Sequence, residues 1–292
     1  MNKGFYHWCC EGIKNDVLFR NVEEFIAGMN RIAVCWLQCR ADGRVVYIWA
    51  FCLLDNHFHF ILYGTEEDTT FFMERYAMLS GQWISRHRGE SLHGTIVLGH
   101  WRAYEGESLR EKIIYNLRQA TEAGLPFTPQ GYPWCSAWLM FSDTTLLGST
   151  CRRASEFSAR KLQKITFSHV SIPDDWQILP TGMIWPGCYT CFAQAEKEFR
   201  GTGDFMFMLN NGQASKKVNA EMMTERPSIP DREVRDMALK IIRRLFRKDG
   251  IGACTAEERL ETARRLRQQL RCGHKQLARI VQMREEDLRA LV

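Results

Sequence analysis

The most constraining feature of this sequence is residues 45–64, which read VVYIWAFCLLDNHFHFILYG. An Asp-Asn pair, which favours a turn, separates two runs of β-branched, aromatic and aliphatic residues, so the stretch predicts a hairpin or two closely spaced strands. Because side chains alternate faces along a strand, we expect His57 and His59 on one face and Phe58 on the other. Two imidazoles roughly 6.5–7 Å apart along one strand can converge on a divalent metal ion. An isolated pair of this kind is more often structural, and that alternative stays open.

The segments around this stretch follow the order β-α-β-β-α-β. The sequence predicts a strand at 5–10, a helix opening at Asn21 with Glu24 in capping-box spacing, a helix at about 69–87, and a further strand within 94–104. This is the ferredoxin-like order, whose antiparallel sheet leaves one face open for a ligand. We therefore expect an α+β fold, with a ferredoxin-like catalytic domain in residues 1–141.

The rest of the chain divides by composition. Residues 142–230 show no readable pattern and form a connecting region, which ends in a Pro-rich linker at 224–230. Residues 231–292 are helical throughout and carry 16 Lys and Arg against ten Asp and Glu. This basic excess predicts a helical module that faces a polyanion, with a helix-turn-helix as one interpretation. A soluble helical packing module with a charged face is the alternative.

Composition excludes several classes of protein. No apolar run reaches the roughly 18 residues of a membrane span, and the N-terminus lacks the apolar core of a secretory signal, so we expect a cytoplasmic protein with no membrane partner. The 11 cysteines are mostly scattered, and we interpret them as reduced, buried thiols. Cys188 and Cys191 alone have a metal or redox spacing, and no second such pair follows.

A second candidate element lies downstream of the histidines. A helix is predicted from Ser108, as N-cap, to Gly124, and it carries Tyr115 and Gln119 four residues apart on one face. A glutamine carbonyl is a reasonable third ligand for a divalent ion held by two imidazoles. A tyrosine one turn away would lie beside that ion, where its hydroxyl could attack a polarised phosphate. The alternative nucleophiles, none of which shares a helical face with a candidate ligand at this spacing, are Tyr76, Tyr104 and Tyr132.

Four further residues are candidates for nucleic-acid binding. Arg86 and Arg88 end the second predicted helix, where cations also favour the helix dipole. Trp101 and Arg102 are suited to stacking a base and holding a phosphate. Trp101 is equally suited to a core position, which is the alternative for that residue.

These motifs together resemble the single-tyrosine HUH transposases, specifically the REP-associated tyrosine transposase branch. The similar segments run from Phe5 to about Trp138, close to half the chain. In order, they are Tyr6-His7, Asp55-Asn56-His57-Phe58-His59-Phe60, Trp83-Ile84-Ser85-Arg86-His87, Trp101-Arg102, Tyr115 through Leu125, and Tyr132-Pro133-Trp134-Cys135-Ser136. The chain departs from the family pattern at Asp55, where a proline is usual, and at Gln119-Ala120, where Asn-Pro is usual. It also lacks the basic residue that follows Tyr-His in the family.

The resemblance implies a specific chemistry. His57 and His59 would bind a divalent cation, usually magnesium or manganese, with Gln119 as a further polar ligand and Tyr115 as the nucleophile. Such enzymes act in DNA transposition and recombination. They cleave single-stranded DNA near hairpins, form a covalent 5′-phosphotyrosine, and rejoin the strand by the reverse step without a nucleotide cofactor. The chain would then be a DNA strand transferase.

Two competing functions follow from the same residues. The chain could instead be a domesticated, catalytically weak nucleic-acid-binding regulator with the same fold. A metal-dependent hydrolase of the histidine-triad kind would require a third alternating histidine, but position 61 is isoleucine. Both a monomer and a homodimer remain open.

Overall fold

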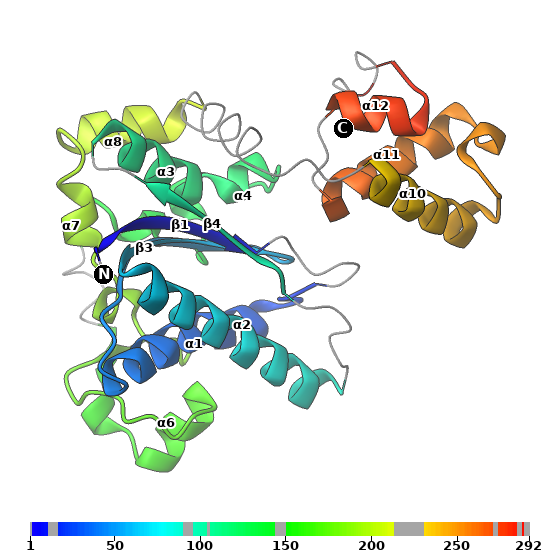
Figure 1. Ribbon diagram of the computed structural model, residues 1–292. Helices are drawn as coiled ribbons and strands as arrows, with labels where there is room; N and C mark the ends of the chain where they lie inside the picture. Colours follow the sequence, from blue (N-terminus) through cyan, green and yellow to red (C-terminus); the bar gives the residue numbers. More distant parts are fainter. Residues whose placement is uncertain are drawn as a thin grey trace. The chain divides into compact units, whose positions relative to one another are not determined.

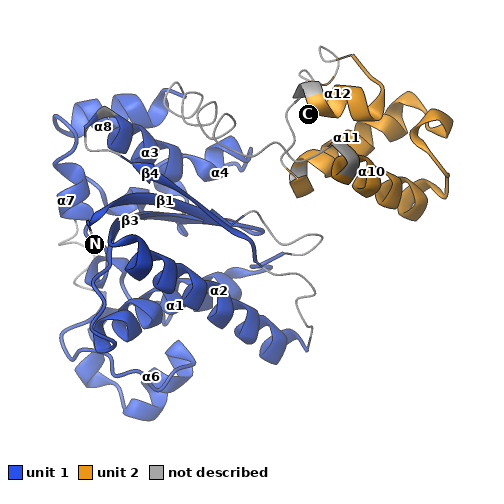
Figure 2. Ribbon diagram, viewed as in Figure 1, with its two compact units in different colours: residues 1–220 blue, residues 221–292 orange. Residues whose placement is uncertain are grey.

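The structure is a computed structural model in which residues 2–10, 17–89, 96–103, 106–143, 150–212, 231–270, 274–284 and 288 are described. The chain divides into two compact units, residues 1–220 and 221–292 (Figure 2). The predicted linker at 224–230 lies outside the described residues. In the described residues, no helix combines the length and apolar character needed to cross a membrane.

The strands and helices of the first unit occur in the predicted order. They are β1 (Gly4–Cys10), α1 (Val22–Ala41), β2 (Tyr47–Leu53), β3 (Phe58–Gly64), α2 (Glu66–Arg88), β4 (Leu98–Ala103), α3 (Glu107–Leu117), α4 (Gln119–Glu122), β5 (Arg152–Arg153), α6 (Ala159–Thr166), β6 (Gln177–Ile178), α7 (Phe192–Glu196) and α8 (Thr202–Asn210). The second unit contains α10 (Asp231–Phe246), α11 (Ala256–Leu270) and α12 (His274–Val281).

The first four strands form one antiparallel sheet in the order β2-β3-β1-β4. The predicted α+β fold with an antiparallel β-α-β-β-α-β sheet is therefore confirmed, and β2 and β3 form the predicted hairpin. Helices α1 and α2 cover one face of the sheet, and α3 and α8 lie on the other (Figure 1). The expectation of an open face is thus wrong, because the segment that follows β4 folds back over it.

Alternation along the strands divides the interior into two cores. On the α1/α2 face, aromatic side chains of β1 and β3, among them Trp8 and Phe60, pack with Met29 and Phe72. On the α3 face, Ile61 packs with residues of α3 and α8. The connecting region, for which the sequence predicts no function, contributes to both cores. Residues 172–189 join the first core, and residues 195–209 join the second.

The helix termini show which capping signals operate. Asn21 Oδ1 accepts a hydrogen bond from Glu24 N at 3.0 Å, so the predicted N-cap of α1 is present. The Glu24 carboxylate is used elsewhere and bonds the backbone N–H of Arg20 and the guanidinium of Arg88. Helix α2 starts at the N-cap Thr65 and ends at Gly89, whose left-handed backbone (φ 66°) suits glycine.

The helix that carries Tyr115 differs from the prediction. It begins at Glu107 with Gly106 as N-cap and without a side-chain cap, so the predicted N-cap Ser108 is wrong. It also ends at Leu117, and the short α4 continues from Gln119. The Gln119 amide nitrogen donates to the Tyr115 carbonyl oxygen at 2.9 Å, which supports the backbone at this junction.

Two later segments cover the outer edge of β2, which would otherwise present unpaired backbone groups. Leu53 N donates to Trp134 O at 2.8 Å, and Ser136 Oγ accepts from Phe51 N at 2.9 Å. Further along the strand, Cys191 N donates to Ile48 O at 2.7 Å. Residues 134–136 thus pack back on the domain.

The cysteines agree with the interpretation as reduced, buried thiols. All described cysteines are free, and most are buried. Cys188 Sγ accepts from Gln177 N at 3.3 Å, and burial raises the pKa of its thiol to about 11. A thiol that resists ionisation is a poor metal ligand or redox nucleophile. Among the described residues, Cys188 and Cys191 belong to no group of three or more side chains that could hold a metal ion.

Candidate functional site

The pairing of β1 with β3 brings a third histidine to the predicted pair. His7 on β1 lies opposite Ile61, and Cys9 lies opposite His59. His7 Nε2 and His59 Nδ1 share a hydrogen bond of 3.1 Å, with the two rings stacked at 5.4 Å and 11°. The His57 ring lies 5.1 Å from that of His59 at 77°. Three imidazoles thus form a cluster at one end of these two strands.

Tyr115 of α3 packs against this cluster. Its ring lies edge-on to His7, at 5.4 Å and 83°, and to His59, at 5.7 Å and 85°. Tyr115 is 4% exposed and both of these histidines are fully buried, whereas His57 is partly exposed. The structure therefore brings together the strand and the helix that the sequence singled out separately. The catalytic role assigned to Tyr115 stays a prediction.

The hydrogen bonds of the imidazoles define how they could hold a metal. His57 Nδ1 bonds Asn56 Oδ1 at 2.6 Å, and His59 Nδ1 bonds His7. Because Nδ1 of each ring is engaged, Nε2 is the atom that His57 and His59 would offer to a cation. The amide nitrogen of Gln119 is bonded to Tyr115 O, so its carbonyl oxygen is the ligand atom that it would offer.

The donor set decides which metal would fit. In the described part of the chain, no group of three or more His, Cys, Asp or Glu side chains is placed to hold a metal ion. Two imidazoles and one amide oxygen suit a cation of intermediate softness such as Mn²⁺ better than Mg²⁺, which prefers carboxylate and water oxygens. The chemistry of these donors suits a weak, manganese-type site, and metal binding stays a prediction.

The alternative tyrosines have other tasks. The Tyr76 hydroxyl donates to Gly28 O at 3.3 Å, and that of Tyr132 to Leu53 O at 2.9 Å. Burial raises the pKa of both phenols well above the ordinary value. Neither is therefore suited to attack a phosphate. Tyr104 lies outside the described residues.

Trp101 and Arg102 are consecutive residues of β4. Trp101 is paired with His7 across β1 and β4, and the two rings lie 5.9 Å apart. Arg102 is paired with Tyr6, which belongs to the core on the α1/α2 face. Consecutive residues of a strand point to opposite faces. The two side chains therefore lie on opposite faces of the sheet, and Trp101 lies beside the histidine cluster. The predicted contacts of both residues with nucleic acid stay predictions.

The two arginines at the end of α2 also differ. Arg88 is bonded to Glu24 and donates to Val17 O at 2.7 Å and to Leu18 O at 3.0 Å. Its side chain is 5% exposed, so this guanidinium holds the fold together and is not available to nucleic acid. Arg86 is exposed, and its predicted contact with nucleic acid remains a prediction.

His7 is the site residue that the sequence analysis missed as a functional candidate. The sequence marks His7 only as part of the Tyr6-His7 motif, because nothing in its own segment pairs it with another histidine. The signal was the predicted strand order. In a ferredoxin-like sheet the first strand lies beside the third, so a histidine on residues 5–10 is a neighbour of His59.

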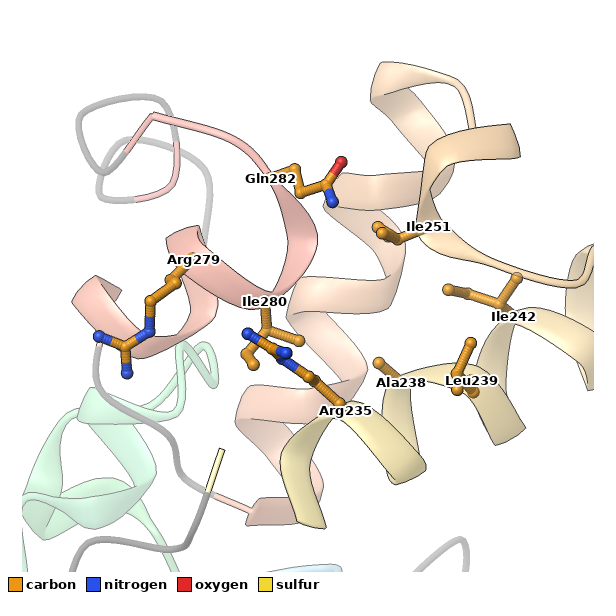
Figure 3. Close-up of a pocket in the computed structure, with 8 residues that line it drawn as sticks. All are labelled: Arg235, Ala238, Leu239, Ile242, Ile251, Arg279, Ile280 and Gln282. Carbon is orange, nitrogen blue, oxygen red and sulfur yellow. The ribbon is translucent and has the colours of Figure 1, made fainter. Parts of the chain in front are cut away.

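The second unit has a core of its own, formed by α10, α11 and α12. Thr255 and Glu258 form a reciprocal capping box at α11, with bonds of 3.3 Å and 2.7 Å. A pocket of about 260 Å³ lies between α10 and α12, and its lining includes aliphatic side chains, Arg235 and Arg279 (Figure 3). The second helix of the predicted helix-turn-helix, at 284–292, lies largely outside the described residues.

Comparisons with known proteins add little to this geometry. No family model matches the sequence, and no curated protein matches it. One solved structure is similar, a REP-associated tyrosine transposase bound to a REP hairpin. The likeness covers 46% of this chain and 76% of that chain, with 11% sequence identity and a TM-score of 0.33. A likeness at this level says nothing of function.

Proposed function

We propose that this chain is a metal-dependent DNA strand transferase that cleaves and rejoins single-stranded DNA next to a hairpin. The nucleophile is Tyr115, and the product of cleavage is a covalent 5′-phosphotyrosine. One observation carries the proposal. The Tyr115 ring lies against His7 and His59, with His57 beside them, although these residues come from three separate elements.

The reaction is a transesterification. The phenolic oxygen of Tyr115 attacks the scissile phosphorus and loses its proton as the new O–P bond forms. The bond from phosphorus to the 3′-oxygen breaks, and that oxygen leaves with a proton as a free 3′-hydroxyl. Rejoining runs the same steps in reverse. The phosphotyrosine keeps the energy of the broken bond, so the reaction requires no ATP.

The neighbouring side chains have defined tasks in this scheme. His57 and His59 would hold the cation, with Gln119 as a further ligand, and His7 orients the His59 ring through its hydrogen bond. A divalent cation offsets the charge that develops on the phosphate. Trp101, which lies against His7, is placed to stack on a base beside the scissile phosphate.

Burial of the cluster favours a second candidate function. Tyr115 is 4% exposed, and His7 and His59 are fully buried, beneath α3. A cluster so enclosed also fits a protein that has kept the fold and binds nucleic acid without cleaving it. In that case the basic second unit supplies most of the affinity, through phosphate contacts that weaken with salt.

One experiment separates the two functions. The full chain is incubated with labelled, hairpin-flanked single-stranded DNA and either Mn²⁺ or Mg²⁺, and the covalent adduct is resolved on a denaturing gel. A strand transferase gives an adduct that Tyr115→Phe abolishes. The matched control is Tyr63→Phe, which alters a tyrosine on the strand that carries His59.

The opposite results identify the regulator. Binding to the same DNA without an adduct in either metal, and with affinity unchanged in His57→Ala, supports a binding protein. An adduct that persists in Tyr115→Phe means that another residue is the nucleophile, and the proposed site is then wrong.

A further inference from the structure

A pocket of about 210 Å³ lies on the side of the sheet opposite the histidine cluster. It is enclosed by α1, α2 and the residues that follow α6. Its buried lining includes Arg31, Val34 and Trp83, and its exposed lining includes Arg86 and Phe167. The pocket therefore runs from an exposed cationic rim to a buried cationic wall, and it is separate from the proposed catalytic residues.

Arg31 is the unusual residue of this pocket. It is 3% exposed, and its Nε donates to Ser80 Oγ at 3.2 Å. Its two terminal nitrogens are also buried, and among the described residues neither finds a hydrogen-bond partner. The guanidinium lies over the Trp83 ring at 5.1 Å and the Phe19 ring at 6.0 Å. A buried guanidinium with unused donors is costly unless an acceptor meets it.

The nearby charges of the described residues leave Arg31 uncompensated. Burial lowers the pKa of Arg31, and the nearest carboxylate influence comes from Glu24. Both oxygens of Glu24 are already bonded to Arg88. Arg31, Arg88 and Glu24 together therefore carry two positive charges and one negative charge. Arg86 adds a further cation at the rim, and no described residue that lines the pocket is acidic.

Two further donors lie around the pocket. The buried Trp83 Nε1 has no hydrogen-bond partner within the described residues. Ser168 Oγ accepts a bond from Val170 N at 3.2 Å, which leaves its hydroxyl hydrogen as a donor. Together with Arg31 and Arg86, these groups offer more N–H and O–H donors than the two oxygens of one carboxylate can accept.

The wall beside the rim is held in a strained conformation. Phe167, which follows α6, has φ 53°, a left-handed backbone that is uncommon for a large side chain. Its ring packs edge-on against His87 at 4.7 Å and 84°, and His87 in turn stacks on Trp83 at 4.3 Å. Strain of this kind is found where a local shape is required, often at a ligand site.

We infer that this pocket binds a phosphate group, either as inorganic phosphate or as a terminal phosphate monoester. A phosphate monoester presents three peripheral oxygens and up to two negative charges, which matches two guanidinium groups and the additional donors. The volume is below the range of roughly 300–1,000 Å³ that is typical of sites for drug-sized ligands, so the pocket suits the phosphate and a few attached atoms. This inference is independent of the proposed strand transfer.

Binding is measured on the full chain by isothermal titration and by the midpoint of thermal unfolding. The ligands are inorganic phosphate, a deoxynucleoside 5′-monophosphate, and acetate, with chloride as the ionic-strength control. An oligonucleotide with a 5′-phosphate is compared with the same oligonucleotide ending in a 5′-hydroxyl. These ligands distinguish a free phosphate from the phosphate at the end of a nucleic acid.

We expect phosphate to bind and to raise the unfolding midpoint, and Arg31→Gln to weaken binding about tenfold or more. Arg86→Gln, on an exposed residue that does not threaten folding, should weaken it by a smaller factor. Arg40→Gln is the matched control, because this exposed arginine lies over the Trp36 ring on the same helix but outside the pocket.

Three results would overturn the inference. The first is a phosphate effect no larger than that of chloride. The second is an effect that is the same in Arg31→Gln and Arg86→Gln as in the unaltered chain. The third is tighter binding of acetate than of phosphate, which would reassign the pocket to a carboxylate. The adduct formed by Tyr115 is unaffected in each case, so the two proposals fail separately.

Discussion

The polar side chains on the two faces of the sheet come from different kinds of element. On the α1/α2 face the strands contribute aromatic and aliphatic residues such as Trp8 and Phe60, and the charged groups come from the helices. Arg31, Arg88 and Glu24 all lie on or beside α1 and α2. On the α3 face the strands themselves contribute His7 and His59, and the helix contributes Tyr115.

This difference has a physical consequence. Strand residues are held by hydrogen bonds on both sides, so their side chains are placed more rigidly than those of a helix that can slide on its neighbour. The histidine cluster therefore suits chemistry that requires a defined geometry. The charges on the α1/α2 face suit the anchoring of helices and the binding of an anion. Substitutions on the two faces should therefore alter different properties of the protein.

The largest effect is expected from Tyr115→Phe. Adduct formation should fall by at least about 10³-fold because the nucleophilic oxygen is removed, whereas the ring still packs against the histidines. The free energy of unfolding in urea should change little. A large loss of stability together with a small loss of adduct would show that the α3 face is a structural core.

Glu24→Gln should have the largest effect on stability, about 3 kcal/mol, because it leaves Arg88 buried without its counter-charge. Burial raises the pKa of Glu24, but bonds from Arg88 and from the Arg20 N–H outweigh it, and the pKa lies below the ordinary value. The ionised carboxylate therefore stabilises the fold at pH values above the ordinary pKa of a glutamate. This contribution is lost as the pH falls through the lowered pKa of Glu24.

Urea unfolding at several pH values checks this expectation. The variant should lack the part of the acid dependence that Glu24 supplies, while adduct formation per folded molecule stays unchanged. Glu66→Gln is the control, because its carboxylate is exposed and bonds the exposed His100. If Glu24→Gln forms less adduct although it is fully folded, the two faces are coupled. Their proposed separation is then wrong.

His7→Phe should have an intermediate effect. It removes the hydrogen bond to His59 Nδ1 but keeps a ring of similar size, so we expect metal affinity and adduct formation to fall about 10- to 100-fold. Titration with Mn²⁺ measures the first and the gel assay the second. Trp8→Phe, at the next position of β1 on the opposite face, should leave both unchanged. Equal effects of the two variants would mean that His7 acts only through packing.

The smallest effect is expected from the helix caps of the α1/α2 face. Asn21→Ala and Thr65→Ala should each lower the free energy of unfolding by about 1 kcal/mol, because each removes one hydrogen bond to a helix N-terminus. Their effects should be close to additive in the double variant, since the two caps belong to different helices. Strong non-additivity would indicate that a contact shared by α1 and α2, and not the cap of each helix, stabilises the two helices.

Much of the fold could be predicted from local patterns. The hairpin at 45–64, the order of the elements, the cap at Asn21 and the stop at Gly89 all follow from residues that are close in the sequence. Two local predictions were wrong. Ser108 does not cap α3, and α3 ends at Leu117 instead of Gly124. At both places the backbone conformation depends on contacts with other parts of the chain, and one segment of sequence does not reveal such contacts.

The amino-acid pattern was sufficient to single out His57, His59 and Tyr115, because their residue types and spacing are visible within single elements. It was not sufficient to bring them together or to add His7, because that depends on β1 lying beside β3 and on α3 folding over the same face. Nor could it foresee that Arg88 is bound within the fold while Arg31 is buried beside a pocket. Local periodicity reports which face a side chain lies on, whereas its partners are chosen by contacts between residues distant in the chain.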